Sequence, residues 1–382
     1  MAFGKTQDAR RDTQRVTPDT AMSYILSVGT ALPPHVVPQD EAATFALRHF
    51  EGRLARHGQL MSIFTNARIA KRHFVAPLEW FSVPHHGLKE RNDLYICSAE
   101  ALGAAAAWQA LDRAGASPRD VDFIVFVSTT GLATPSIDAR LIAKLGMRST
   151  TKRLPVWGLG CAGGVAGLAR AAEFVRAFPD KLALLVSVET CSITFQFDDF
   201  SKKNFVAAAI FADGAAAVVV GGSDWVRRVA PAGNATLQYV ASHSHIFPNS
   251  EHVMGWDIVD TGLSVIFAPE IPARIARDMQ PVVGDFLGEC RLDLSDLSHY
   301  VLHPGGARVI EAYREAFALD EIALQSSSDV LCECGNMSSP TVLFVLERML
   351  QTGRITPGQY ALMGALGPGF SSELALLKGA VF

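Results

Sequence analysis

Short apolar segments with the pattern of buried strands alternate along this chain with segments that have the pattern of helices. An Ala- and Leu-rich helix is predicted over residues 97–114, and an apolar strand over 121–127. The same order recurs with a helix over 161–178 and a strand over 182–188. This alternation favours a layered α/β fold in which a largely parallel sheet is buried between helices.

The second half of the chain repeats the alternation. Its predicted elements are helices over 271–287, 305–317 and 338–350 and strands over 299–303, 360–365 and 373–377. The regular pattern breaks down near 221–233. We therefore predict two copies of one α/β unit, residues 21–228 and 229–382, behind a flexible N-terminal segment 1–20.

Composition and charge exclude several classes of protein. The chain has 382 residues, with 34 Lys and Arg against 38 Asp and Glu, so no basic excess is present to neutralise a nucleic-acid backbone. No apolar run reaches the roughly 18 residues of a membrane span, and the N-terminus lacks the apolar core of a secretory signal. We expect a cytoplasmic protein without nucleic-acid partners or stable membrane insertion. Its six cysteines are too dilute for a disulfide framework, so each is a core residue or a reactive thiol.

Cys161 lies in the segment GLGCAGG, at the start of a predicted helix. A helix N-terminus presents free N–H groups and the positive end of the helix dipole, which predicts a depressed thiol pKa. The neighbouring glycines allow the backbone to approach a bound acyl group closely. The alternative is a cysteine buried in a glycine-rich turn for packing alone. Glycines on both sides favour the nucleophile.

Two polar residues stand at the ends of predicted elements in the second half. His303 ends an apolar strand in VLHPGG, and strand ends are where open α/β sheets place their sites. Its imidazole is suited to a thiolate–imidazolium pair with Cys161 and to donation to a thioester oxygen. Asn336, in CGNMSSPT, carries an amide that can donate to a developing oxyanion, and the alternative is a helix N-cap. The spacing of Cys332 and Cys334 lacks a second pair, which favours core cysteines over a metal site.

Four motifs occur along the chain in the order GLGCAGG, VLHPGG, CGNMSSPT and GALGPGF. In this order and with these separations they resemble the type III polyketide synthases, the chalcone synthase superfamily of thiolase-fold enzymes. The resemblance extends from about residue 24 to residue 382. It implies a thiolase-like α/β fold whose two duplicated halves form a layered αβαβα core.

The resemblance also implies roles for the three polar residues. Cys161 is then the nucleophile that takes an acyl group from its CoA thioester. His303 and Asn336 then promote decarboxylation of malonyl-CoA and stabilise the enolate for a Claisen condensation. The implied enzyme is an acyltransferase whose substrates are CoA thioesters, with neither a further cofactor nor a metal ion.

Further positions are assigned to the substrate cavity by the same resemblance. Phe211 matches the family's gatekeeper between the CoA tunnel and the cavity, with plain core packing as the alternative. Val265 stands where plant members commonly have a second gatekeeper phenylalanine, and Trp256 fills a position that is commonly glycine in plant enzymes. The other implied substrate-binding positions are Cys191, Ile193, Thr194, Thr134, Gly367, Pro368 and Ser338.

The resemblance implies partners as well. Thr134 belongs to the segment through which each subunit of the family's homodimer reaches its neighbour's cavity, so a homodimer is expected. CoA phosphates require basic groups at the tunnel mouth, and we assign Arg68, Arg72 and Arg308 to that place. A solvated helix face is the alternative for Arg68 and Arg72.

Departures from the plant pattern bear on the substrate. The open gate at Val265 and the bulk of Trp256 favour a long aliphatic starter in a tunnel over an aromatic one, and Cys191 resembles bacterial members. We expect a long-chain fatty acyl-CoA to be extended with malonyl-CoA and cyclised to an alkylpyrone. The alternatives are synthesis of 1,3,6,8-tetrahydroxynaphthalene from malonyl-CoA alone, a β-ketoacyl synthase III-like enzyme, and a thiolase-fold protein without catalysis.

Overall fold

The computed structural model describes residues 21–53, 61–84, 86–229 and 235–381. The segment 1–20, which we predict to be flexible, lies outside the described residues, as does 230–234 beside the predicted boundary between the halves. Among the described residues, none of the helices has the length and apolarity needed to span a bilayer.

The elements alternate along the chain as the sequence predicts. In the first part they are β1 (Ser23–Ala31), β2 (His35–Pro38), α1 (Gln39–Phe50), α3 (Ser62–Asn66), β3 (Lys71–Phe74), α4 (Leu88–Arg113), β4 (Val121–Val127), α5 (Ile137–Leu145), β5 (Lys152–Val156), α6 (Gly163–Ala177), β6 (Leu182–Thr190), α7 (Lys202–Ile210), β7 (Asp213–Gly222) and α8 (Ser223–Val229). In the second part they are β8 (Ala235–Ile246), β9 (Met254–Val259), β10 (Gly262–Phe267), α9 (Ile271–Glu289), β11 (Leu297–Leu302), α10 (Ala307–Phe317), α11 (Gln325–Cys334), α12 (Thr341–Gln351), β12 (Tyr360–Gly367) and β13 (Ser371–Val381).

Several predicted helix starts are shifted. Helix α4 begins at Leu88 rather than at residue 97. Its first turns bury Arg91 and Tyr95, whereas the prediction relied on the small aliphatic residues of the later turns. Helix α6 begins at Gly163 because residues 160–162 form a separate 3-10 turn.

The predicted largely parallel sheet is wrong in its strand directions. Nine strands form one sheet in the order β11-β12-β13-β8-β1-β7-β6-β4-β5. Only the pairs β11–β12, β6–β4 and β4–β5 are parallel, and the other neighbouring pairs are antiparallel. The physical reason is connection length: β12 returns into β13 through a short turn, which permits only antiparallel pairing, whereas a helical crossover is needed for parallel strands.

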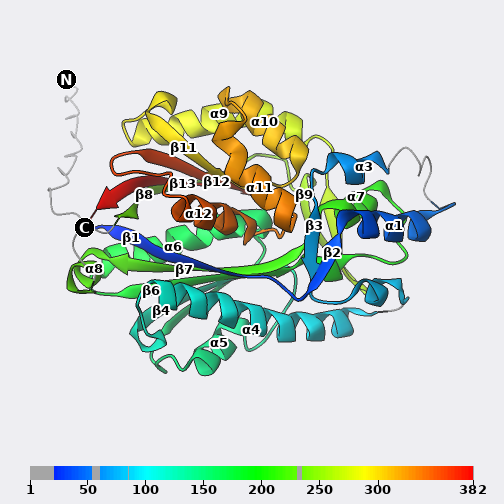
Figure 1. Cartoon of the computed structure of the whole chain (residues 1–382), viewed down its shortest axis with the longest axis horizontal. Coiled ribbons are helices and arrows are strands. Elements are labelled where there is room, and N and C mark those ends of the chain that lie inside the picture. Colours follow the sequence, from blue (N-terminus) through cyan, green and yellow to red (C-terminus); the bar gives the residue numbers. More distant parts are fainter. Residues whose placement is uncertain (1–20, 54–60, 85, 230–234, 382) are drawn as a thin grey trace, which may run out of the picture.

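Five layers result from this topology, as Figure 1 shows. Strands β1 and β8 pair only at Ser23–Ile25, so the sheet divides into a part with β1 and β4–β7 and a part with β8 and β11–β13. Helices α4 and α5 cover one outer face, α6 and α12 fill the space between the two parts, and α9 and α10 cover the other outer face. The predicted thiolase-like αβαβα core is confirmed.

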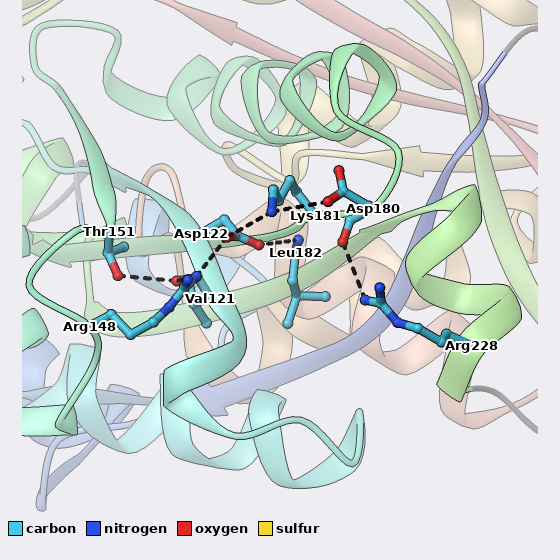
Figure 2. A network of polar contacts seen from close by, with 8 residues as sticks. All are labelled: Val121, Asp122, Arg148, Thr151, Asp180, Lys181, Leu182 and Arg228. Atoms are coloured by element: carbon cyan, nitrogen blue, oxygen red, sulfur yellow. Dashed lines mark hydrogen bonds and ion pairs between the residues drawn. The ribbon is translucent and has the colours of Figure 1, made fainter.

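A network of charged side chains closes the N-terminal ends of β4 and β6 (Figure 2). The Asp122 carboxylate accepts from Arg148 Nη2 at 2.6 Å and from the Leu182 backbone N–H at 3.1 Å, and it lies 3.8 Å from Lys181 Nζ. Arg148 also donates to the Val121 carbonyl. Since these groups hold one end of the parallel strands, the opposite, C-terminal ends are free to carry a site.

Candidate active site

Cys161, His303 and Asn336 come from different parts of the sequence and line one cavity. Cys161 lies in the 3-10 turn just before α6, His303 directly after β11, and Asn336 after α11. All three side chains are buried, with relative exposures of 9%, 3% and 1%. The face-to-face packing of the two halves therefore brings together the three residues that the sequence singled out.

The turn that holds Cys161 depends on a glycine with a left-handed conformation. Gly160 has φ +48°, and a Cβ at this position would lie 2.7 Å from Cδ of Pro368. The Gly160 N–H donates to Thr129 Oγ1 at 3.1 Å, which fixes the turn on the loop after β4. The thiol itself donates to Ser338 Oγ at 3.4 Å. The glycines of GLGCAGG thus allow the close approach of the Pro368 loop to the nucleophile.

His303 presents an imidazole without a hydrogen-bond partner to the cavity. Its backbone N–H donates to the Gly364 carbonyl at 2.9 Å and extends the β11–β12 pairing by one residue. Both ring nitrogens are buried and make no hydrogen bond to any described residue. A buried polar group without a partner is unfavourable, so these nitrogens are available to an oxygen or a proton of a bound substrate.

Asn336 is held by its own side chain rather than serving as a helix N-cap. Its Nδ2 donates to the Gly305 carbonyl at 2.9 Å, and its Oδ1 accepts from the Ser338 N–H at 2.8 Å. Helix α12 begins only at Thr341, so the N-cap interpretation is wrong. One amide N–H of Asn336 is left for a ligand, and its direction is fixed by the two other bonds.

Burial governs the protonation of the cysteine and the histidine. Desolvation raises the pKa of the Cys161 thiol to about 12 and lowers the pKa of His303 to about 3. The predicted depression of the thiol pKa is therefore wrong for this structure, because the loss of water outweighs the lowering effects of Ser338 Oγ and of the backbone at Cys161. The resting pair is a neutral thiol and a neutral imidazole, and His303 is the base in the same cavity that can take the thiol proton during attack.

We expect decarboxylation of malonyl-CoA by a Cys161→Ala variant to be constant between about pH 5.5 and 8. Without the thiol no proton can pass from it to His303, and because burial lowers the pKa of His303 to about 3, the imidazole stays neutral over this range. Acetyl-CoA formation from malonyl-CoA, measured at several pH values, tests this. A fall in rate centred near 6.5, the ordinary histidine value, would show that burial does not control His303.

The predicted gatekeeper positions line the same cavity. Phe211, Trp256 and Val265 lie in its wall, and the Phe211 and Trp256 ring centroids are 5.8 Å apart. Ser338 and Pro368 also line it. Phe211 in addition lines a second chamber, so its ring separates two spaces.

The second chamber has a mainly apolar wall. The predicted residues Cys191 and Thr194 line it, together with residues of α1, β3, α7 and the turn 78–82: Ala42, Phe45, Arg72, Phe74, Leu78, Phe81, Ser192, Phe195, Ala207 and Ala208. Phe211 is the lining residue that this chamber shares with the cavity of Cys161.

Three other predicted positions do not line either space. Ile193 borders a small separate pocket with Thr194, and its carbonyl accepts a hydrogen bond from Arg91. Gly367 is buried in the sheet, where a Cβ would lie 2.3 Å from the Leu159 carbonyl oxygen. Thr134 is exposed and lines neither of these two spaces.

The basic residues divide into buried and exposed ones. Arg72 is wrong as a phosphate ligand at the tunnel mouth: it is 1% exposed, and its Nη1 donates to the carbonyls of Ala208 and Phe211 at 2.7 and 2.9 Å. Its segment is strand β3 and not a helix, so the solvated helix face is wrong as well. Arg68 is exposed but pairs with Glu311 at 2.8 Å.

Arg308 lines a wide groove that adjoins the reaction cavity. The groove and the cavity share Phe267, Ile271, Gly305 and Val309 in their walls. Lys202 and Lys203 of α7 line the groove as well, and sequence reasoning missed them. In the sequence they are only two adjacent lysines before an apolar segment. The fold shows that both line the same groove as Arg308.

The comparisons with known proteins agree with this geometry. The family model "Chalcone and stilbene synthases, N-terminal domain" matches residues 10–224, and the model of the C-terminal domain of the same family matches residues 238–381. The chain belongs to the chalcone and stilbene synthase family. It is therefore a type III polyketide synthase and an acyltransferase.

Relatives of this polyketide synthase match over nearly its whole length. It is 42% identical over 367 residues to "Putative chalcone synthase" of Bacillus subtilis (strain 168), covering 94% of this chain and 100% of the relative. It is 38% identical over 357 residues to 1,3,6,8-tetrahydroxynaphthalene synthase of Streptomyces peucetius subsp. caesius, covering 93% and 92%. The solved structure of 1,3,6,8-tetrahydroxynaphthalene synthase from Streptomyces coelicolor A3(2), a bacterial type III polyketide synthase, superposes with a TM-score of 0.86 at 30% identity and covers 94% of this chain and 99% of that one.

Glu189, which sequence reasoning missed, is a buried carboxylate that holds loops beside the active site of this polyketide synthase. Glu189, at the end of β6, accepts from the backbone N–H groups of Thr129 and Thr130 at 2.9 and 3.0 Å and from Ser339 Oγ at 2.8 Å. Thr129 in turn accepts from the turn of Cys161, and Ser339 follows the segment of Asn336. Burial raises the pKa of Glu189 to about 7. This carboxylate joins the loops of both halves.

Proposed function

We propose that this type III polyketide synthase loads a long-chain fatty acyl group from CoA onto Cys161, extends it with malonyl-CoA and closes the chain to an alkylpyrone. The observation that supports it is the second, mainly apolar chamber behind Phe211. An alkyl chain is stabilised by transfer from water into such a space, by about 0.8 kcal/mol for each buried methylene.

The arrangement of the site is suited to both half-reactions. In loading, Cys161 Sγ attacks the acyl carbonyl and its proton passes to His303. The bond to CoA then breaks, and His303 returns the proton to the CoA sulfur, so that CoA leaves as a thiol. In extension, the C–C bond to the malonyl carboxylate breaks, CO₂ leaves, and the electron pair remains as an enolate. The unpartnered His303 imidazole and the free Asn336 N–H supply donors to the enolate oxygen. The enolate carbon then attacks the Cys161 thioester and releases the thiolate.

The groove beside Arg308 supports delivery of both substrates as CoA thioesters. Arg308, Lys202 and Lys203 line it, and none of the three forms an ion pair with a carboxylate of the described residues. We assign the CoA phosphates to these cations. In this assignment Lys202 and Lys203 take the places that we predicted for Arg72, which is buried, and Arg68, which is paired with Glu311.

A homodimer is the assembly that we propose. Strand β5 is an edge of the nine-stranded sheet, and an uncovered edge offers unpaired backbone groups to a second chain. Leu132 and Trp157, near this edge, are 44% and 49% exposed, and Thr134 is exposed beside Leu132. Sedimentation or light scattering tests the oligomeric state.

A ladder of saturated acyl-CoAs with malonyl-CoA, analysed by mass spectrometry, tests the starter. We expect kcat/KM to be highest for long chains and the products to be alkylpyrones. Formation of 1,3,6,8-tetrahydroxynaphthalene from malonyl-CoA alone would overturn the proposal in favour of the second candidate, which the names of two related proteins support.

A substitution in the chamber wall tests whether the starter chain lies in the chamber. Ala42 is buried in α1 and lines the chamber, so Ala42→Leu should lower kcat/KM for long starters by about 10-fold and leave short starters within about twofold. Ala43→Leu, on the same helix but outside the chamber wall, is the matched control. Equal losses for long and short starters would show that the chain lies elsewhere.

A further inference from the structure

A tyrosine hydroxyl without a partner faces the reaction cavity. Tyr313 projects from α10, is 2% exposed and lines the cavity that holds Cys161, His303 and Asn336. Its hydroxyl oxygen makes no hydrogen bond to any described residue and is not fully enclosed by protein, so it is open to the cavity that Tyr313 lines. Sequence reasoning gave it no role, because helix α10 was recognised only as a helix after VLHPGG.

The wall around Tyr313 is otherwise apolar. Helices α9 and α10 contribute Ile271, Ile275 and Val309, and β12 contributes Leu366. Among the described residues of this wall, Tyr313 is the only one with a polar side chain. A saturated acyl chain packed here would leave the hydroxyl unsatisfied, at a cost of about 1–3 kcal/mol.

The hydroxyl is a donor at any working pH. Burial raises the pKa of Tyr313 above its ordinary value. Tyr313 and Cys161 line the same cavity. An acceptor oxygen on a chain bound to Cys161 would therefore give the Tyr313 hydroxyl a hydrogen-bond partner.

We propose that Tyr313 is a specificity-determining residue whose hydroxyl donates a hydrogen bond to a keto oxygen of the growing poly-β-keto chain. A saturated starter carries one oxygen, at the thioester, and His303 and Asn336 already supply donors to that position. Each condensation adds one keto oxygen further along the chain. Tyr313 therefore acts only after the first condensation, and it favours the bound, extended chain over early release.

The proposal uses the family's condensation reaction and does not depend on which starter is loaded. It predicts that the number of extensions, and not the rate of decarboxylation, responds to the hydroxyl. Loss of one such bond to an uncharged acceptor corresponds to about a 3- to 10-fold change in the ratio of longer to shorter products.

Tyr313→Phe removes the hydroxyl and keeps the ring. The assay uses one starter and malonyl-CoA. We expect the rates of malonyl-CoA decarboxylation and of Cys161 acyl-adduct formation to stay within about twofold of the unmodified enzyme. Intact-protein mass spectrometry measures the adduct. The ratio of tetraketide to triketide products should fall by about 3- to 10-fold.

Tyr300→Phe is the matched control. Tyr300 is also buried and packs on the same ring, with its centroid 6.0 Å from Phe317 against 6.4 Å for Tyr313, but it does not line the cavity. An unchanged product ratio in Tyr313→Phe, or the same shift in Tyr300→Phe, would overturn the proposal. If malonyl-CoA alone primes the enzyme, the alkylpyrone assignment fails, but the product ratio of malonyl-primed chains still tests Tyr313.

Discussion

Cys161→Ala is expected to reduce polyketide formation by at least about 10³-fold, because no other thiol can carry the acyl chain in this cavity. Malonyl-CoA decarboxylation should continue within about fivefold, since His303 and Asn336 keep their donors. Product analysis and acetyl-CoA formation measured on the same sample separate the two effects.

The control for this variant is Cys97→Ala. Cys97 is exposed on α4 and lies outside the cavity wall, so both activities should be unchanged. Loss of decarboxylation together with condensation in Cys161→Ala would contradict the division of roles, because it would mean that the thiol takes part in the decarboxylation step.

Asn336→Ala is expected to lower malonyl-CoA decarboxylation by about 10²- to 10³-fold. The amide supplies one fixed N–H to the enolate oxygen, and its direction depends on the bonds to the Gly305 carbonyl and the Ser338 N–H. The rate of acetyl-CoA formation measures the effect, and thermal unfolding shows whether the fold is retained.

Asn336→Asp keeps one of the two bonds that hold the side chain and loses the bond to the Gly305 carbonyl. A carboxylate can still accept from the Ser338 N–H, but it has no N–H for the enolate and repels its charge. We expect a loss at least as large as in Asn336→Ala. Activity near that of the unmodified enzyme in Asn336→Asp would show that Asn336 only shapes the turn.

The sequence predicted the element order well, because hydrophobic periodicity reports which face of each segment is buried. It failed on strand direction and on helix starts. Strand direction depends on how connections return, and the antiparallel centre of the sheet, β7 to β1 to β8 to β13, is decided by pairings between segments far apart in the chain.

The basic residues show the same limit. Arg72 and Arg308 are equally basic in the sequence, but Arg72 lies under the end of α7 and Arg308 lies in an open groove. Lys202 and Lys203 become groove residues only because α7 and the start of α10 border the same groove. Burial and the direction of a side chain are properties of the packed fold, which no short motif contains.

Four ordered motifs in the sequence by themselves determined the family, the thiolase-like architecture and the three residues of the reaction centre, since glycine-rich turns and strand ends restrict which side chains can sit there. Only the tertiary structure decided the protonation of Cys161 and His303, the chamber behind Phe211, and the place of Glu189 and Tyr313. The physical reason is that desolvation, cavity shape and unpaired hydrogen-bonding groups arise when distant segments pack together.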